Sequence, residues 1–245
     1  MKKIAMIPAR YAATRFPFKL MQPLGNKTVI RHTHDNTLAT TLFDEVIVVT
    51  DHEVIFNEII NHGGKAIMST GQHESGSDRI AEAVAEMEVA IIVNVQGDEP
   101  FVKKEPLQKL LAAFDDEQVQ VASLMKKFRD MEPVKNPNYV KVVVDKNSNA
   151  LLFSRSVIPY LRDETLSPVY YEHIGVYAFR KQALLNFTKW PTAKNELVEK
   201  LEQLRYLENG VTIKMVETDE TTVKIDVPED LDAAENYLKT TFKNR

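Results

Sequence analysis

The stretch that decides the fold is residues 90–95, which read A-I-I-V-N-V. It is apolar almost throughout and too short for a helix, and residues 46–49, V-I-V-V, form a second run of this kind. Such runs are typical of parallel strands that are buried beneath helices on both faces of a sheet. The two runs therefore predict a parallel sheet.

Helical and β-rich stretches alternate outward from these runs. That alternation predicts a doubly wound, mostly parallel α/β sheet of the Rossmann-like type. In such sheets ligands bind beyond the carboxyl ends of the strands, so every strand-end loop is a candidate site. We expect further strands at 4–7, 66–68 and 119–125, and helices at 29–42, 54–61, 80–87 and 106–114.

The pattern changes after Pro137. Residues 139–144 and 150–153 flank D-K-N-S-N, which is typical of a hairpin turn. We therefore expect one domain over residues 1–245 with an inserted hairpin lobe at about 130–170, acting as a lid or a dimer contact. Beyond this lobe we expect strands at 174–179 and 212–216, and helices at 181–187, 197–207 and 231–238.

The composition narrows the possible functions of the 245-residue chain. It has no cysteine, which excludes disulfides, thiolate zinc sites and cysteine nucleophiles. A net charge of −4 argues against general nucleic-acid binding, so an anionic ligand needs a local cluster of cations. No stretch approaches the roughly 20 apolar residues that span a bilayer, and the first apolar run is too short for a signal peptide. We expect a cytoplasmic protein without membrane insertion.

A basic loop follows the first expected strand. Within ten residues it carries Arg10, Arg15 and Lys19. The loop has neither the P-loop pattern nor a Rossmann glycine triad, so phosphate binding there must rely on side chains. A planar guanidinium group can hold two phosphate oxygens. A solvated basic loop is the alternative, and the position at a strand end favours the anion site.

Two acids and one serine-rich loop are further candidates. Asp98 follows the apolar run 90–95, and Asp226 follows a short strand late in the chain. A turn or a helix start is the alternative for each acid. Mg²⁺ is commonly held by one or two carboxylates together with water and phosphate oxygens. In the loop at 70–79, Ser75 or Ser77 can cap the next helix, and Gly76 would let a ligand approach the backbone.

These segments resemble the cytidylyltransferases that activate 3-deoxy-manno-octulosonate (Kdo), an acidic eight-carbon sugar of lipopolysaccharide. Residues 8–19 are similar to the family motif P-A-R-x-x-S/T-x-R-x-P-x-K, residues 95–100 to V-Q-G-D-E-P, and residues 225–231 to V-D-T-P-E-D-L. The resemblance implies a nucleotide-diphospho-sugar transferase fold, a homodimer, and transfer of CMP from CTP to the sugar with release of pyrophosphate.

The resemblance also implies roles for single residues. The catalytic set is Arg10, Arg15, Lys19 and Asp98, and Asp98 and Asp226 would bind Mg²⁺. The nucleotide-binding set is Pro8, Ala9, Arg10, Arg15, Lys19, Ser75, Gly76 and Arg79.

Four downstream segments resemble family segments that would bind the sugar. They are residues 136–143, 153–159, 172–177 and 201–205. A sugar acid needs an arginine for its carboxylate and several hydrogen-bonding groups for its hydroxyls. A plain surface or core position is the alternative for each residue taken singly. The implied sugar-binding residues are Gln96, Arg155, His173, Tyr177, Glu202 and Gln203.

Two residues depart from the family pattern. Phe18 stands where many relatives have glycine, which adopts a positive φ far more readily. Glu172 stands where some relatives have a basic residue, and a carboxylate near the sugar would favour a cation. An 8-amino variant of Kdo is therefore an alternative substrate, as is a sialic or other nonulosonic acid. A non-catalytic nucleotide-binding protein on the same fold is the alternative of another class.

Overall fold

The structure is a computed structural model that describes residues 1–12, 16–71, 73, 75–220 and 223–241. The chain forms two compact units. The first unit comprises residues 1–105 together with 221–245, and the second comprises residues 106–220. The N-terminal and C-terminal parts of the chain therefore meet in one unit, although they lie far apart in the sequence.

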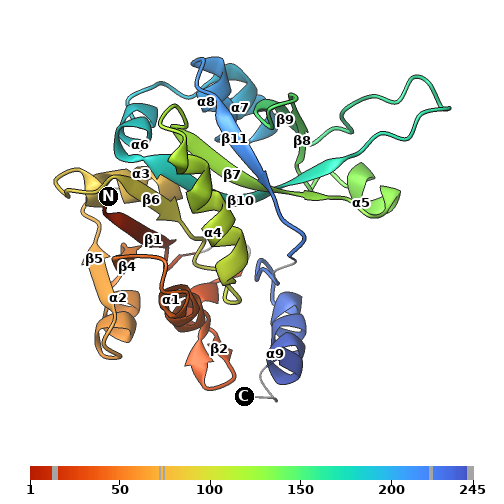
Figure 1. Cartoon of the computed structure of the whole chain (residues 1–245). Coiled ribbons are helices and arrows are strands. Elements are labelled where there is room, and N and C mark those ends of the chain that lie inside the picture. Colours follow the sequence, from red (N-terminus) through yellow and green to blue (C-terminus); the bar gives the residue numbers. More distant parts are fainter. Residues whose placement is uncertain (13–15, 72, 74, 221–222, 242–245) are drawn as a thin grey trace. The chain divides into compact units, whose positions relative to one another are not determined.

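The first unit is built on four parallel strands, as the apolar runs predict. They lie in the order β6-β1-β4-β5 (Figure 1). Residues 4–7 of β1 are at most 1% exposed, which explains why that run has no polar side. A short antiparallel pair, β2 (Pro23–Leu24) and β3 (Lys27–Thr28), stands apart from them. The four strands are β1 (Lys3–Ala9), β4 (Glu45–Thr50), β5 (Lys65–Met68) and β6 (Ile91–Asn94).

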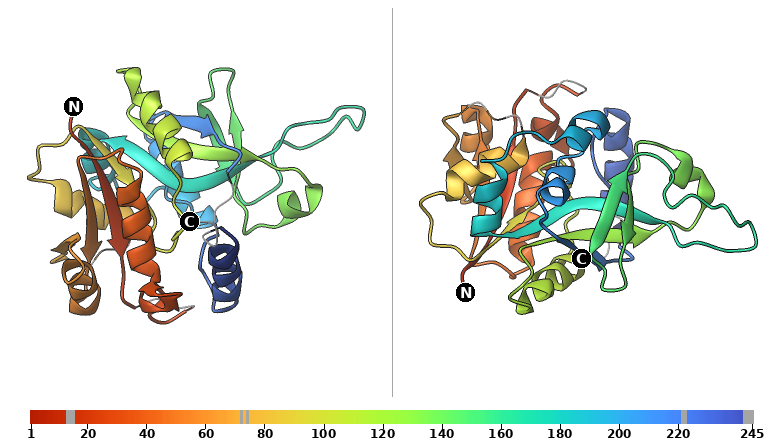
Figure 2. Two further views of the ribbon diagram at one scale, coloured as in Figure 1. Left: turned by 60° about the horizontal axis from the view of Figure 1, so that its bottom comes forward. Right: turned by 90° about the horizontal axis from the view of Figure 1, so that it is seen from above.

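Helices cover both faces of these strands. The crossovers from β1 to β4 and on to β5 place α1 (Val29–Ala39) and α2 (Glu53–Ile60) on one face (Figure 2). The chain then returns to the other side of β1, which places α3 (Gly76–Val84) on the opposite face. Because the strand order reverses between β1 and β6, their carboxyl ends form the expected ligand-binding edge. The unit also holds α9 (Glu229–Thr241).

The second unit is mostly antiparallel. Its strand β10 (Tyr171–Arg180) pairs antiparallel with β7 (Val121–Lys127), and β11 (Ile213–Glu217) pairs parallel with β7. The predicted hairpin is confirmed as β8 (Lys141–Val144) and β9 (Ala150–Ser154). Its helices are most of α4 (Lys104–Ala112), α5 (Met131–Lys135), α6 (Lys181–Phe187), α7 (Lys194–Glu199) and α8 (Leu204–Glu208).

The single helix predicted at 197–207 is wrong, because the chain breaks there into α7 and α8. Lys200 adopts a left-handed conformation (φ 55°, ψ 49°) that ends α7. Arg205 then turns back to form hydrogen bonds of 2.5 and 2.8 Å with both carboxylate oxygens of Glu196, and its guanidinium lies 4.1 Å from the Phe187 ring centroid. These buried contacts override local helix propensity. Gln203 consequently lies in a turn rather than on a helix face.

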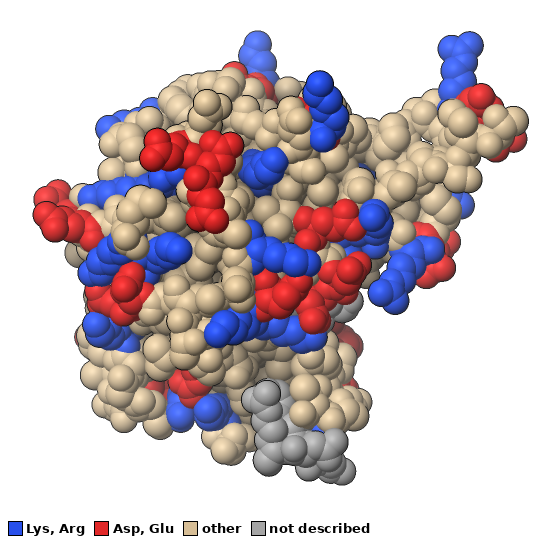
Figure 3. All heavy atoms as spheres, viewed as in Figure 1, with Lys and Arg blue, Asp and Glu red and all other residues tan. Residues whose placement is uncertain are grey.

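Acidic and basic side chains are interspersed over the face of the molecule in Figure 3. That face therefore lacks the broad basic surface by which proteins bind nucleic-acid phosphates. Among the described residues, no helix is both long and apolar enough to cross a membrane.

Candidate active site

Three predicted residues from distant parts of the chain meet in the first unit. The ammonium group of Lys19, in the 3₁₀ helix η1 (Lys19–Met21), forms a hydrogen bond with Asp98 Oδ2 and lies 3.3 Å from Asp226 Oδ1. It also donates to the carbonyl oxygen of Ile225 at 3.2 Å. The segments of the two acids are tied directly, since Ile225 N donates to Asp98 O at 3.0 Å. The structure thus brings Lys19, Asp98 and Asp226 together, and we refer to these three residues as the acid–lysine cluster.

The donor set of this cluster fits a divalent cation. Asp98 Oδ1 is buried and has no hydrogen-bond partner within the described residues, an arrangement that is costly unless a ligand completes it. No group of three or more His, Asp or Glu side chains in the described ranges is arranged to hold a metal. A Mg²⁺ ion held by Asp98 and Asp226 would thus complete its shell with phosphate oxygens and water, as Mg²⁺ usually does.

Two charged residues beside the cluster were not singled out from the sequence. Lys224 Nζ lies 3.2 Å from Asp226 Oδ2; burial opposes its charge, but Asp98 and Asp226 together raise the pKa of Lys224. Glu99 is 7% exposed, and burial together with the charge of Asp98 raises its pKa to about 7. Burial also acts against the charge of Asp226, whose pKa the lysines nevertheless hold below its usual value. A local count of charges around each acid would have been the available signal.

Pro8, at the end of β1, is the point on which two other loops pack. A Cβ atom on Gly76 would lie 3.0 Å from Pro8 Cγ, and one on Gly97 would lie 3.0 Å from Pro8 O. Both distances are tighter than ordinary carbon contacts, so a larger residue would push the loops apart. The glycines of two family motifs therefore have a packing reason within this unit.

Arg79 holds the start of the basic loop. Its guanidinium group donates to Ala9 O at 3.1 Å and to Asp51 Oδ2 at 2.9 Å, and Tyr11 N donates to the other oxygen of Asp51 at 3.1 Å. Burial would raise the pKa of Asp51, but the Arg79 and Tyr11 hydrogen bonds lower it. Arg79 is 5% exposed, while Arg10 is exposed. The predicted phosphate ligand Arg15 lies outside the described residues.

Ser75, in the loop before α3, has a structural role. Ser75 Oγ accepts from Asp78 N at 3.1 Å and so caps α3, which settles the choice between Ser75 and Ser77. Because α3 begins at Gly76, which lies against Pro8, the first turn of α3 is beside the end of β1.

Phe18 has a left-handed backbone, with φ 57° and ψ 25°. The conformation that glycine supplies in many relatives is thus present here in an aromatic residue. The Phe18 ring centroid lies 4.6 Å from that of Tyr11, which in turn stacks on His52 at 3.8 Å with an interplanar angle of 12°. The contact of Phe18 with this stacked pair accounts for the tolerance of an unfavourable backbone at Phe18.

The second unit brings together three of the predicted sugar-binding residues. His173 and Tyr177 lie on β10 with ring centroids 5.3 Å apart, and Gln203 Nε2 lies 3.4 Å from His173 Nδ1. The hydroxyl of Tyr177 is buried and forms no hydrogen bond of good geometry with the described residues, although the Ser123 hydroxyl on the paired strand acts to lower its pKa. Burial, followed by the charge of Glu202, raises the Tyr177 pKa well above its usual value. Burial lowers the His173 pKa to about 3, so this ring is neutral at pH 7.

Arg155 stands just beyond β9 and is anchored to two backbone carbonyls. Its Nε donates to Glu199 O at 2.8 Å and its Nη1 to Pro137 O at 3.0 Å, which leaves further N–H groups for a ligand. The fully buried Lys141 donates to Arg155 O at 2.5 Å and to Tyr139 O at 2.7 Å. The lysine of the family's N-P-N-x-V-K segment therefore shapes the backbone around Arg155.

The remaining two predicted residues are placed differently. Glu202 is exposed in the turn before α8. Gln96 belongs to the first unit, where its amide lies 3.2 Å from Asn94 Oδ1 on the loop that leads to Asp98.

The second departure, Glu172, is paired within the sheet. It lies opposite Lys126 in the antiparallel register of β10 and β7, with 3.3 Å between the charged groups. Its carboxylate therefore has a cation of its own chain, and the reason for expecting an amino group on the sugar is removed.

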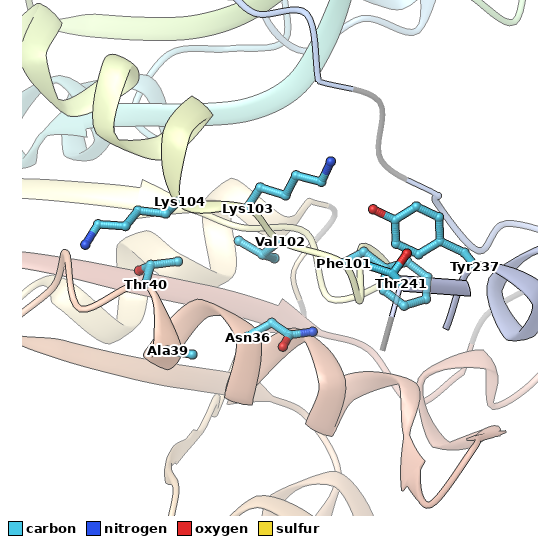
Figure 4. Close-up of a pocket in the computed structure, with 9 residues that line it drawn as sticks. All are labelled: Asn36, Ala39, Thr40, Phe101, Val102, Lys103, Lys104, Tyr237 and Thr241. Carbon is cyan, nitrogen blue, oxygen red and sulfur yellow. The ribbon is translucent and has the colours of Figure 1, made fainter. Parts of the chain in front are cut away.

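A cavity of about 360 Å³ in the first unit is lined by none of the predicted site residues. Its walls come from α1, residues 101–104 and α9 (Figure 4). The rings of Phe101 and Tyr237 are 4.5 Å apart beside it.

Comparisons with known proteins agree with this geometry. The profile of a family described as cytidylyltransferase matches residues 4–214. The 3-deoxy-manno-octulosonate cytidylyltransferase of Flavobacterium johnsoniae is 57% identical over 242 residues, which cover 98% of this chain and 99% of the relative. This chain belongs to the family of 3-deoxy-manno-octulosonate cytidylyltransferases. The family member of Christiangramia forsetii is 53% identical over 238 residues, with 96% of each chain covered.

Two solved structures share the fold of this chain. A CMP:2-keto-3-deoxy-manno-octonic acid synthetase complexed with CTP matches with a TM-score of 0.93 and 35% identity over 98% of this chain and 99% of its own. A 4-diphosphocytidyl-2C-methyl-D-erythritol synthase from Anaerococcus prevotii matches with a TM-score of 0.64 and 18% identity over 97% and 99%, which shows the fold alone. The α/β architecture with a mostly parallel sheet is thereby confirmed.

Proposed function

We propose that this chain transfers CMP from CTP to the anomeric hydroxyl of 3-deoxy-manno-octulosonate and releases pyrophosphate. The observation that carries the proposal is the acid–lysine cluster, in which Asp98 keeps one buried oxygen without a partner in the described residues. Such a cluster at the carboxyl ends of β1 and β6 suits a metal-bound nucleotide triphosphate. The names of the closely similar relatives support CTP and this sugar. CMP-Kdo made in this way would supply lipopolysaccharide synthesis, and we expect it to form in the cytoplasm, where CTP is available.

The nucleotide would bind on the first unit. Arg10, Arg15 and Lys19 would neutralise the phosphates and stabilise the pyrophosphate that leaves. Arg79 would act by fixing the backbone of Ala9. Ser75 and Gly76 would border the nucleotide at the start of α3.

Asp98 and Asp226 would hold Mg²⁺ in the loaded enzyme. When bound, the ion supplies positive charge that polarises the α-phosphate and helps to align the triphosphate. Lys19 occupies the space between the two acids in this structure, so it would turn toward the phosphates as they bind.

The reaction requires one bond to form and one to break. The oxygen of the anomeric hydroxyl forms a bond to the α-phosphorus, and the bond from the α-phosphorus to the β-phosphate oxygen breaks. The hydroxyl proton passes to solvent or phosphate. Positioning and charge neutralisation suffice for such chemistry, and no covalent enzyme intermediate is required.

The sugar would bind to residues of the second unit that we call the sugar cluster, namely Arg155, His173, Tyr177, Glu202 and Gln203. Arg155 has guanidinium N–H groups left for the sugar carboxylate, and the buried Tyr177 hydroxyl and the amide of Gln203 would bind sugar hydroxyls. Glu202 completes the proposed set within the second unit.

We further propose that the inserted lobe at about 130–170 forms a homodimer contact. Its exposed apolar side chains include Leu151 at 61%, Tyr160 at 85% and Leu166 at 62% exposure, which is typical of an association surface. The segment between β9 and β10 extends away from the strands of its unit (Figure 1). Light scattering of wild type and Tyr160→Asp/Leu166→Asp should show a dimer and a monomer; a monomeric wild type contradicts this proposal.

One assay tests the reaction. Pyrophosphate release is measured with CTP and Mg²⁺ alone, and then with Kdo, 8-amino-Kdo and a sialic acid in turn. We expect turnover that depends on Kdo and is at least about tenfold lower in kcat/KM with either other sugar, a difference of about 1.4 kcal/mol. Preference for 8-amino-Kdo or sialic acid would replace the sugar assignment, and no sugar-dependent release would remove the enzymatic one.

Arg155→Ala separates the two substrates. Because Arg155 belongs to the sugar cluster, the KM for Kdo should rise by about tenfold or more while the KM for CTP changes little. A change confined to the CTP KM would contradict the role of Arg155.

A further inference from the structure

Ser123 is a buried hydroxyl beside His173 and Tyr177 of the sugar cluster. It lies on β7 with 0% exposure, opposite a register shift in β10 between Ile174 and Tyr177. Its Oγ lies 2.9 Å from Val176 O, 3.1 Å from Ile174 O and 3.1 Å from His173 Nε2. One hydroxyl thus lies within hydrogen-bonding distance of two backbone carbonyls of β10 and of the His173 ring.

Counting protons determines the direction of these hydrogen bonds. A serine hydroxyl has one proton, and the carbonyl oxygens of Ile174 and Val176 can only accept. The proton is therefore directed to these carbonyls, and Ser123 Oγ meets His173 Nε2 with a lone pair. His173 Nε2 must then carry the ring proton, which leaves Nδ1 of the neutral ring bare.

The tautomer of His173 in turn orients Gln203. A bare Nδ1 accepts a hydrogen bond, so the group that faces it at 3.4 Å has to be the NH₂ end of the Gln203 amide. The carbonyl end is then the end that remains to accept from a ligand. Gln203 is 7% exposed and lies in the turn before α8, so its amide is held among packed residues.

We propose that Ser123 is a positioning residue that fixes His173 as the Nε2–H tautomer and thereby directs the carbonyl oxygen of Gln203 toward a hydroxyl of the sugar. Ser123 itself touches no substrate in this arrangement. The contact with the sugar rests on the proposed function, whereas the tautomer of His173 does not. A site built in this way favours a hydroxyl donor over a group that can only accept.

The tautomer is tested first on the free wild-type protein. Two-bond ¹H–¹⁵N spectra of histidine-labelled protein distinguish a protonated from a bare ring nitrogen, and His173→Asn assigns the signals. We expect His173 with a protonated Nε2 and a bare Nδ1 at pH 7. A protonated Nδ1, or a mixture of both tautomers, overturns the proposal whatever reaction the protein catalyses.

Ser123→Ala then tests the consequence. Without an acceptor at Nε2, we expect the ring to become the Nδ1–H tautomer and the Gln203 amide to turn over. The KM for Kdo should rise about tenfold, a change of about 1.4 kcal/mol, with the KM for CTP unchanged. Ser123→Thr keeps the hydroxyl and should restore both the spectrum and the KM.

A matched control removes another buried hydroxyl. Thr37 is 0% exposed on α1, where its Oγ1 donates to Thr33 O at 2.7 Å, outside both clusters. Thr37→Val should change neither the His173 spectrum nor the KM for Kdo. An unchanged tautomer and unchanged Kdo KM in Ser123→Ala would overturn the role of Ser123. If Ser123→Ala does not fold, Ser123→Cys, which offers a far weaker acceptor, gives the same contrast.

Discussion

Lys19 forms an ion pair with Asp98 through one carboxylate oxygen and leaves the other oxygen buried without a partner among the described residues. The pairing neutralises a charge that would otherwise repel the neighbouring acid Asp226. It also occupies part of the space that a metal ion would need. The lysine is therefore both a counter-ion for the acids and the first group to move when a metal-bound nucleotide arrives.

Asp98→Asn tests the metal assignment with a nearly isosteric side chain. Because an amide has no charge to bind Mg²⁺, we expect kcat to fall to less than about a tenth of wild type, at least 1.4 kcal/mol of barrier. Isothermal titration should also show weaker Mg²⁺ binding, while circular dichroism remains unchanged. Asp232→Asn, an exposed acid on α9, is the matched control and should retain both. Retention of more than a tenth of kcat in Asp98→Asn would remove the metal role.

Lys19→Met separates the counter-ion role from phosphate binding. Without the lysine, the two acids repel each other in the metal-free protein, so its Tm should fall, and Mg²⁺ should bind about fivefold more tightly because nothing has to be displaced. Turnover should nevertheless drop, since a phosphate ligand is lost. Lys27→Met removes a comparable ion pair with Asp35 in the same unit and should leave Mg²⁺ affinity unchanged. Weaker Mg²⁺ binding in Lys19→Met contradicts this view.

Much of this site could be predicted because the sequence pattern shows where the strands end. The apolar runs before Arg10 and Asp98 end abruptly, and parallel strands collect their carboxyl ends at one edge. The partner acid Asp226 is also a candidate from its position after a short strand, although a helix start explains that position in part, and its metal role came from the family resemblance. Lys224 and Glu99 are close in sequence to the two acids, so a count of neighbouring charges would have marked them, but their effect on the site depends on burial, which the sequence does not show.

The second unit was less predictable for a different physical reason. The left-handed Lys200 divides α7 from α8, and the ion pair between Arg205 and Glu196 joins the two helices across this break. A helical pattern therefore placed Gln203 on the wrong kind of element. A buried contact across a break of this kind depends on the folded structure, and a helical sequence pattern does not predict it.

Phe18 offers a test of backbone strain within the basic loop. A left-handed conformation costs a residue with a Cβ about 1 kcal/mol, so Phe18→Gly should be more stable toward urea than Phe18→Ala by about that amount. Both variants lose the ring contact with Tyr11, so their difference isolates the backbone. Ser148, also left-handed at φ 60°, should show the same order for its Gly and Ala variants. An alanine variant at position 18 that equals the glycine variant would mean that the loop relaxes out of this conformation.

His173 makes the stability of the protein depend on pH. Burial lowers its folded-state pKa to about 3, below the value near 6.5 of an exposed histidine, so the unfolded chain binds more protons between these values. The part of the free energy of unfolding that depends on neutral His173 is therefore fully present above about pH 6.5. It is lost as the pH falls toward 3, by at most about 1.4 kcal/mol per pH unit.

Urea unfolding of wild type and His173→Asn between pH 4 and 8 measures this contribution. The free energy of unfolding of wild type, relative to the variant, should decrease as the pH falls below about 6.5 and stay level above it. His62→Asn removes an imidazole whose side chain is 42% exposed and should give a much flatter difference. A wild-type advantage that grows on acidification would mean that His173 becomes protonated in the folded protein. The neutral ring on which its hydrogen bonds to Ser123 and Gln203 depend would then be absent.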